Sequence, residues 1–156
     1  MNYKKLNNIT GWVVFSIATF VYLTTMEQTT SLWDCGEYIT TANKLEVGHP
    51  PGAPFFMMLG RLFSAFASPE NAAMMINSMS ALSSSFSILF LFWTITMLAR
   101  KMAKLTGEID KNTSIAVLGS GAIGALAYTF TDSFWFSAVE GEVYAMSSFC
   151  TAIVFW

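Results

Sequence analysis

Two carboxylates, Asp34 and Glu37, and the chain's single histidine, His49, lie close together in the stretch from Ser31 to Phe56. Asp34 and Glu37 are three residues apart, and on a helix that spacing places both side chains on one face. A carboxylate held beside a hydroxyl group can accept its proton as a general base. The residue types and their spacing therefore allow acid–base chemistry on a substrate that approaches this stretch.

The same two acids also fit patterns that only stabilise a helix. Ser31-x-x-Asp34 and Asp34-x-x-Glu37 both match helix-capping patterns, in which a side chain accepts a hydrogen bond from a free backbone N–H group. Acids in a first helical turn are also favoured by the helix dipole. Both explanations predict a helix that begins near Asp34 and continues past Thr41 to Lys44.

The segment GHPPGAP, residues 48–54, predicts a rigid turn that is not helical. Pro50 and Pro51 fix their own φ angles and restrict the residues before them. Gly48 and Gly52 permit φ values that other residues avoid. Such a turn would determine where the imidazole of His49 points, and a hydrogen-bonded structural role for this lone histidine stays open beside a functional one.

Arg61 follows in the apolar segment 53–67, which is only about half as long as a membrane span requires. A segment of this length predicts a helix that lies along the membrane surface or dips into it. Arg61 could then extend its charged end to the lipid headgroups. Alternatively, its planar guanidinium could bind a phosphate group.

A second polar segment, residues 132–142, is also acidic. It contains Glu140 and Glu142, and Tyr144 follows at the start of the next apolar run. Acids at a membrane edge are often only solvated. Two acidic segments that face one another on the same side could nevertheless enclose a polar cavity above the bilayer.

The elements that position these residues are predicted to be membrane helices. Of the 156 residues 54% are hydrophobic and 12% are charged, against about 25% charged in a typical soluble domain. The net charge of −2 gives no indication of nucleic-acid binding. Since a spanning helix needs roughly 20 apolar residues, we expect an all-α membrane protein with spans at about residues 9–26, 71–99, 112–131 and 143–156. The last of these runs reaches the chain end in mid-pattern, so we expect the chain to be the N-terminal piece of a larger protein.

Lysine and arginine predict the orientation of these spans. Lys4 and Lys5 precede the first span, and the segment 100–111 is basic, so both should be cytoplasmic by the positive-inside rule. The segments 27–70 and 132–142 are acidic and should lie outside. A cleaved signal peptide is the alternative for the first apolar run, but the run is longer than the usual core of 7–15 residues and lacks a small-residue cleavage site.

The third predicted span contains Gly119-Ser120-Gly121-Ala122-Ile123-Gly124, which fits the G-x-G-x-x-G pattern of dinucleotide-binding turns. That pattern needs a soluble, charged helix after the glycines, whereas uncharged apolar sequence follows here. Small residues in a membrane helix also permit close packing of two helices. We therefore expect a packed membrane helix at this position.

The order of three motifs resembles the GT-C membrane glycosyltransferases, and most closely a bacterial protein O-mannosyltransferase-like family. The motifs are WDCGE at residues 33–37, VGHPPGAP at residues 47–54 and GEVYAM at residues 141–146. The resemblance extends over essentially all of the chain. Members of the family are several times longer and usually end in a soluble part, which agrees with the expectation that this chain is an N-terminal piece.

This resemblance implies an integral enzyme of the bacterial inner membrane that transfers a sugar, most plausibly mannose, from a polyprenyl phosphate to a Ser/Thr hydroxyl of a protein on the external face, with inversion. Asp34 matches the acidic motif of the family. The family's two acids are adjacent, whereas Asp34 and Glu37 are separated by two residues, so the motif does not decide which is the base. No metal site is evident, although some GT-C enzymes use a divalent ion. The expected substrate-binding residues are Lys44, His49, Arg61, Glu140, Glu142 and Tyr144.

Two other functions fit a membrane chain of this composition. A transporter or flippase of a lipid-linked or anionic solute would place functional acids near the middle of the bilayer. A non-catalytic subunit of a membrane assembly would need no carboxylate chemistry. Because every acid falls in a loop or at the edge of a span, the pattern favours the enzyme.

Overall fold

The computed structural model describes residues 2–107 and 109–156, and it contains helices without any strand in that part of the chain. This confirms the predicted all-α class. The helices are α1 (Tyr3–Thr25), α2 (Cys35–Lys44), α3 (Pro54–Ser64), the short 3-10 helix η1 (Pro69–Asn71), α4 (Ala72–Thr106), α5 (Lys111–Thr129), α6 (Asp132–Val139) and α7 (Val143–Phe155).

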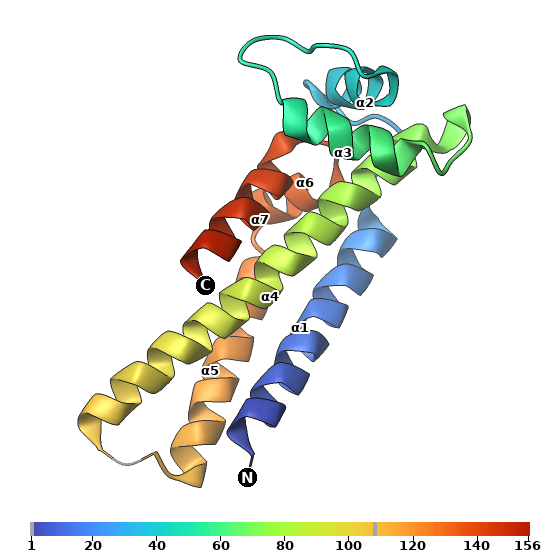
Figure 1. Cartoon of the computed structure of the whole chain (residues 1–156). Coiled ribbons are helices and arrows are strands. Elements are labelled where there is room, and N and C mark those ends of the chain that lie inside the picture. Colours follow the sequence, from blue (N-terminus) through green and yellow to red (C-terminus); the bar gives the residue numbers. More distant parts are fainter. Residues whose placement is uncertain (1, 108) are drawn as a thin grey trace.

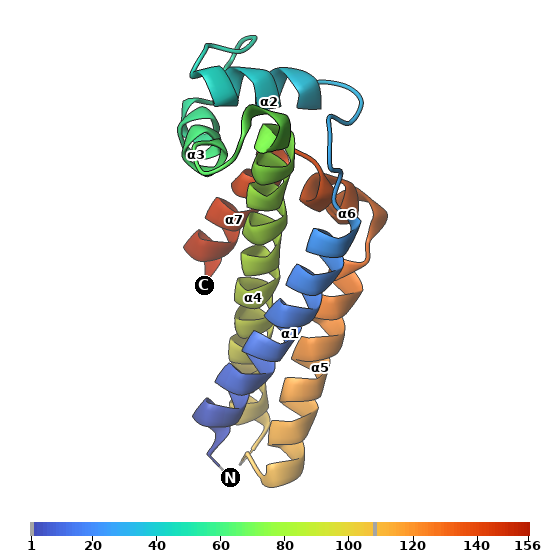
Figure 2. The same cartoon turned by 90° about the vertical axis from the view of Figure 1, so that its right-hand side faces the viewer.

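Helix α4 forms the centre of the molecule and contacts every other helix (Figures 1 and 2). Its buried residues Ala81, Ile88 and Phe92 pack with Val14 and Ala18 of α1 and with residues of α5 and α6. The two views show α2 and α3 across one end of the bundle. The N-terminus and the connection between α4 and α5 lie at the other end.

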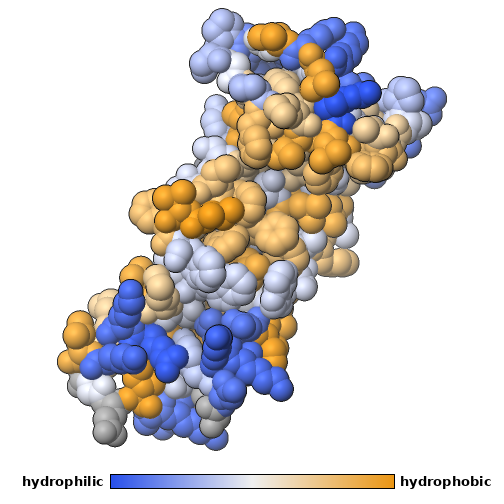
Figure 3. All heavy atoms as spheres, in the orientation of Figure 1, coloured by the Kyte–Doolittle hydropathy of each residue, from blue (hydrophilic) through white to orange (hydrophobic). Residues whose placement is uncertain are grey.

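Two helical stretches, Tyr3–Thr25 and Pro69–Leu105, are long and apolar enough to cross a membrane. Helices α5 and α6 meet the same criterion only together, and they are bent by 67° at the break between them, while Val143–Phe155 is a shorter apolar helix. Figure 3 shows an apolar middle region of the surface between two hydrophilic ends. This surface is typical of a protein that lies across a bilayer, and the four spans with their limits stay a prediction.

Helix α4 continues well beyond residue 99, where the second span was expected to end. The predicted basic loop 100–111 is therefore helical as far as Thr106, and residue 108 lies outside the described residues. Lysine and arginine are good helix formers, and positive charge is favourable near a helix C-terminus. The basic residues therefore do not end the helix, which stops at Gly107.

The glycine-rich segment lies inside α5, as expected for a packed membrane helix. Gly121 is buried against Thr96 and Phe92 of α4, where a Cβ atom would collide with the Thr96 side chain. At Gly124 a Cβ atom would lie 3.2 Å from Ile95. Small residues thus let α5 approach α4 closely, and the segment forms no dinucleotide-binding turn.

The apolar segment 53–67 contains the short helix α3, which packs against α2 and against the start of α4. Gly60 allows this contact, because a Cβ atom there would lie 2.8 Å from Cβ of Ala42 in α2. Phe56 and Met57 of α3 are buried where this helix packs against α2 and α4. The helix therefore holds α2 across the end of the bundle (Figure 2).

Candidate active site

An acidic pocket of about 430 Å³ opens at the end of the bundle that carries α2 and α3. One wall is the segment before α2, and the other consists of the end of α6, the connection to α7 and the start of α7. Its lining residues are Ser31, Leu32, Trp33, Asp34, Phe136, Ser137, Glu140, Glu142 and Tyr144. Four of the predicted site residues, namely Asp34, Glu140, Glu142 and Tyr144, thus come together from distant parts of the chain.

Asp34 occupies the N-cap position of α2, but its side chain makes no capping hydrogen bond. Its backbone has α-helical angles, and its carbonyl accepts a hydrogen bond from the N–H group of Tyr38 at 2.9 Å. Since side-chain caps normally come from residues in the β region, this geometry directs the carboxylate elsewhere. The side chain of Asp34 therefore does not cap α2, and its carboxylate borders the acidic pocket.

The carboxylates of the acidic pocket influence one another. Partial burial raises the pKa of Glu142, and the negative charges of Glu140 and Asp34 raise it further. Burial also raises the pKa of Tyr38, with smaller contributions from Asp34 and Glu142 among other neighbours. Groups of like charge in one site titrate apart, so that one can hold a proton while another has lost it. Glu142 therefore keeps its proton to a higher pH than an ordinary glutamic acid.

Asn77 and Gly141 hold the two walls of the pocket together, and sequence analysis did not identify either. The buried amide of Asn77 in α4 donates to the carbonyl oxygens of Glu27 at 2.7 Å and Thr29 at 2.9 Å. Gly141 packs so closely that a Cβ atom would lie 2.8 Å from Oδ1 of Asn77 and 3.1 Å from Ile39 of α2. Asn77 could have been found from the sequence, because it lies within an uncharged apolar run where its buried amide needs hydrogen-bond partners.

Trp33 stands on the rim of the pocket and was also missed. Its backbone is in the left-handed region with φ 62°, and 93% of the residue is exposed. This conformation is rare for a bulky residue and tends to occur at functional sites. No local pattern in the sequence indicates it.

Glu37 faces the GHPPGAP turn and does not line the acidic pocket. Its Oε1 accepts a hydrogen bond from the backbone N–H group of His49 at 2.7 Å, and Nδ1 of His49 lies 3.1 Å from both carboxylate oxygens. These hydrogen bonds lower the pKa of Glu37. The helical spacing does not bring Asp34 and Glu37 into one pocket, because Glu37 bonds to His49 whereas Asp34 borders the acidic pocket.

The predicted cationic partners of a phosphate are also placed outside the pocket. Arg61 donates from Nη1 to the carbonyl oxygen of Asn43 at 2.8 Å and lies 3.3 Å from its Oδ1. It thereby occupies a carbonyl group at the C-terminal end of α2, where helices leave such groups without intrahelical partners. Lys44 is exposed in the last turn of α2, and neither it nor His49 lines the pocket.

The acidic residues do not form a metal centre in the described part of the chain. No group of three His, Cys, Asp or Glu side chains there is arranged to hold one ion.

Comparisons with known proteins find similarity over most of the chain, including most of the residues that line this pocket. The family model of the protein O-mannosyl-transferase TMEM260 N-terminal domain matches residues 34–156. The protein O-mannosyl-transferase tmem260 of Dictyostelium discoideum is 28% identical over 145 residues, which cover 91% of this chain and 16% of that protein. The protein O-mannosyl-transferase TMEM260 of Mus musculus is 25% identical over 135 residues, which cover 86% of this chain and 17% of that protein.

The chain thus spans only about a sixth of the length of these curated relatives. No solved structure matches it. The family match begins at Asp34 and includes α2, the GHPPGAP turn and the segment with Glu140 and Glu142. Every predicted site residue therefore lies within the matched part of the chain.

Proposed function

Because the chain belongs to the family of the protein O-mannosyl-transferase TMEM260 N-terminal domain, we propose that it forms part of a membrane mannosyltransferase. The enzyme would transfer mannose to a Ser/Thr hydroxyl group of a protein. The observation that carries this proposal is the carboxylate of Asp34, which borders an acidic pocket without being used as a helix cap. Family membership supplies the reaction class, and the pocket supplies a group suited to it.

The general base of the proposed reaction is Asp34. A hydroxyl group is a weak nucleophile near neutral pH, and a carboxylate within hydrogen-bonding distance can accept its proton during attack. The hydroxyl oxygen forms the new bond to the anomeric carbon as the bond from that carbon to the donor's oxygen breaks. The electron pair of the broken bond leaves with the donor's phosphate, and a single displacement of this kind inverts the anomeric centre.

We further propose that Glu142 binds the sugar or the acceptor. A carboxyl group with a raised pKa keeps its proton to a higher pH than an ordinary glutamic acid, and in that state it can donate a hydrogen bond. Tyr144 lies beside it at the beginning of α7, exposed and able to donate or accept. Glu140 completes the polar lining of the same wall.

The donor is proposed to be a polyprenyl-phosphate sugar, which would place its lipid chain in the membrane and its sugar in the pocket. The phosphate that leaves needs cationic or hydrogen-bonding partners. Lys44, His49 and Arg61 are the proposed candidates, and they lie at the same end of the molecule on α2, the GHPPGAP turn and α3. Glu37 is proposed to position that turn through its hydrogen bond with the backbone of His49.

The arrangement gives no support to a transporter or flippase. In the described part of the chain, α1, α4 and α5 contain no aspartate or glutamate. A solute pathway through the membrane would need polar or charged groups near the bilayer midplane. The acids occur instead at the ends of the bundle, where a membrane enzyme meets its acceptor.

The proposal is tested with Asp34→Asn in the full-length protein. The variant should transfer mannose from a polyprenyl-phosphate donor to an acceptor protein at least about 100-fold more slowly, since a general base contributes roughly 10²–10⁴-fold. Its expression and membrane insertion should be unchanged. The assay measures labelled mannose on the acceptor in proteoliposomes.

Two control variants show whether a loss of activity is specific to Asp34. Glu46→Gln removes an exposed acid that does not line the pocket and should keep normal activity. Glu37→Gln keeps an acceptor for the N–H group of His49 and should lose much less activity than Asp34→Asn. Near-normal turnover of Asp34→Asn would contradict the assignment of Asp34, and a selective loss in Glu37→Gln would move the base to that residue.

A further inference from the structure

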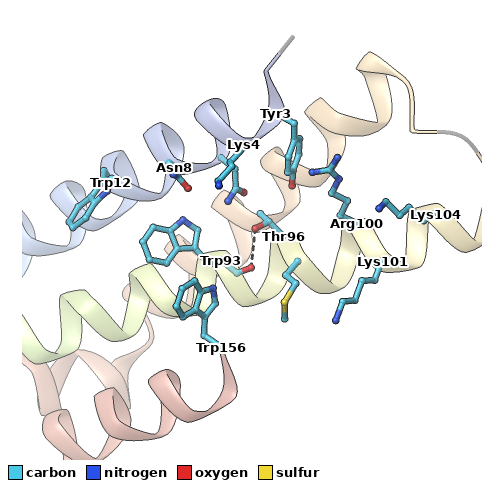
Figure 4. Close-up of a pocket in the computed structure, with 12 residues that line it drawn as sticks. Tyr3, Lys4, Asn8, Trp12, Trp93, Thr96, Arg100, Lys101, Lys104 and Trp156 are labelled. Atoms are coloured by element: carbon cyan, nitrogen blue, oxygen red, sulfur yellow. Dashed lines mark hydrogen bonds between the residues drawn. The ribbon is translucent and has the colours of Figure 1, made fainter.

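A second pocket lies at the opposite end of the bundle, between α1 and α4, and it has the reverse charge (Figure 4). Its volume is about 740 Å³. Four cations line it, namely Lys4, Arg100, Lys101 and Lys104, and its described lining contains no aspartate or glutamate. This basic pocket takes no part in the function proposed above.

The cations of the basic pocket lack anionic partners among the described residues, where Glu37 and His49 form the one ion pair. Arg100 is held with its guanidinium carbon 3.9 Å from the centre of the Tyr3 ring. This stacking uses the flat face of the guanidinium and leaves the N–H groups at its edge for a planar or tetrahedral anion. The buried Nε of Arg100 has no hydrogen-bond partner in the described structure. A phosphate group would satisfy both the charge and the free donor.

The basic pocket continues into an apolar groove along α1. A neighbouring hollow of about 680 Å³ shares Asn8 and Trp12 with it and is lined further on by Ile9, Val13 and Phe20. These apolar side chains are about half exposed or more, with Phe20 at 70%. A ligand that fills both hollows must therefore have an anionic head and an apolar tail.

The length of this groove matches one leaflet of a membrane. From Ile9 to Phe20 the helix rises about 16 Å, at 1.5 Å per residue. Half of a hydrocarbon core of about 30 Å has nearly the same depth. Basic pockets between membrane helices are known to bind anionic lipid headgroups. We propose that the two hollows together form a binding site for one anionic glycerophospholipid, with its phosphate between Lys4 and Arg100 and an acyl chain along α1 (Figure 4).

The test measures lipid binding to the purified full-length protein by native mass spectrometry. Phosphatidylglycerol and phosphatidylcholine with identical acyl chains are titrated separately, and the anionic lipid should bind more tightly. Each cation near an anionic headgroup contributes roughly a fivefold change in affinity. Lys4→Gln/Arg100→Gln should therefore weaken phosphatidylglycerol binding by roughly 25-fold, with little change for phosphatidylcholine.

Two further variants and one further ligand serve as controls for the lipid-binding measurement. Lys111→Gln removes a cation at the same end that does not line the pocket, and it should leave binding unchanged. Lys4→Gln spares the stacked arginine and should still weaken phosphatidylglycerol binding roughly fivefold if Lys4→Gln/Arg100→Gln fails to fold. Glycerol phosphate, which has the head without the tail, should bind much more weakly than the lipid.

Three outcomes would overturn the proposal. Equal binding of glycerol phosphate and phosphatidylglycerol would identify a phosphate site with no role for the groove. Equal affinity for the two lipids would remove the role of charge. Anionic selectivity that survives both variants would place the lipid elsewhere on the full-length protein, as would happen if another part of that protein covers this pocket.

Discussion

At the scale of single residues, Asp34 and Glu142 show how one pocket can place two carboxyl groups in different environments. The pKa of Glu142 is raised, first by burial and then by the charges of Glu140 and Asp34. A raised pKa in the folded state means that the proton is held more tightly than in the unfolded chain. The stability that this group contributes is therefore complete below its unfolded pKa and is lost as pH rises through its folded pKa.

This linkage predicts the behaviour of Glu142→Gln. At neutral pH the variant should be more stable than the unsubstituted protein, because it removes the partly buried charge beside Glu140 and Asp34. The gain should be below about 1 kcal/mol, since the carboxyl group is partly exposed to water, and it should shrink as the pH falls toward 4. Thermal unfolding of the full-length protein in detergent at several pH values measures the difference.

Glu70→Gln provides the control for this comparison. Glu70 is exposed in η1 outside the acidic pocket, so its replacement should produce no pH-dependent gain. If Glu142→Gln were the less stable protein at neutral pH, the carboxylate of Glu142 would be engaged in a favourable contact that its environment does not show.

Some residues of the candidate site could be predicted from the sequence, and others could not. Asp34, Glu140, Glu142 and Tyr144 were identified as polar groups flanking apolar runs, and the structure places them around one pocket. The partnership of Glu37 with His49 was not predicted, because it depends on how the GHPPGAP turn packs against α2. Trp33 could not be found, since its left-handed backbone depends on the tertiary structure around it.

At the scale of elements, the contacts of α4 determine whether the walls of the acidic pocket meet. Asn77 connects α4 to the segment after α1 through two hydrogen bonds, and the N–H group of Glu27 in that segment donates to the carbonyl of Val139 at 2.9 Å. Gly141 fits against Asn77 with no space for a side chain. One asparagine thus links three segments that are distant in sequence.

Asn77→Ala should therefore destabilise the full-length protein by about 2–3 kcal/mol, because it removes two hydrogen bonds and leaves carbonyl groups without a donor. Denaturant unfolding measures this change. Ser78→Ala is the matched control, since the Ser78 hydroxyl bonds only to the carbonyl of Met75 within the same helix. Equal stability of the two variants would show that the 27–29 segment does not depend on Asn77.

The presence of most helices was easier to predict from the sequence than the residues at which they begin and end. The apolar runs and the breaks between them indicated α1, α4 and α5, and the GHPPGAP segment indicated the break between α2 and α3. The predicted basic loop 100–111 is helical as far as Thr106, because lysine and arginine are compatible with a helix and their charge does not indicate where it ends. Helix α6 was missed inside the expected turn 132–142, since eight residues between two apolar runs carry too short a pattern to distinguish a helix from a turn.

At the scale of the whole molecule, the two ends differ in charge and are proposed to face different compartments. The acidic pocket and α2–α3 lie at one end, and the N-terminus and the α4–α5 connection lie at the other (Figure 1). We propose, from the positive-inside rule, that the basic end faces the cytoplasm. Donor and acceptor would then meet the enzyme on the external side.

Single cysteines test this orientation in the full-length protein in sealed vesicles or intact cells. Val47→Cys and Leu105→Cys suit the purpose because these residues are 93% and 88% exposed and lie at opposite ends. A membrane-impermeant maleimide added outside should label position 47 at once, and position 105 only after the membrane is opened. The unsubstituted protein corrects for native cysteines, and labelling of both positions from one side would disprove the spanning arrangement.

The unbroken length of α4 gives the molecule a fixed distance between its two ends. Asn77 supports the acidic pocket and Arg100 lines the basic pocket, and along the helix they are separated by about 35 Å. A protein anchored by its basic end therefore carries its acidic pocket at a constant height above that anchor. In a thicker bilayer the pocket would sink toward the lipid, and in a thinner one it would stand farther out in water, so the thickness of the surrounding membrane would itself tune the access of a lipid-linked sugar.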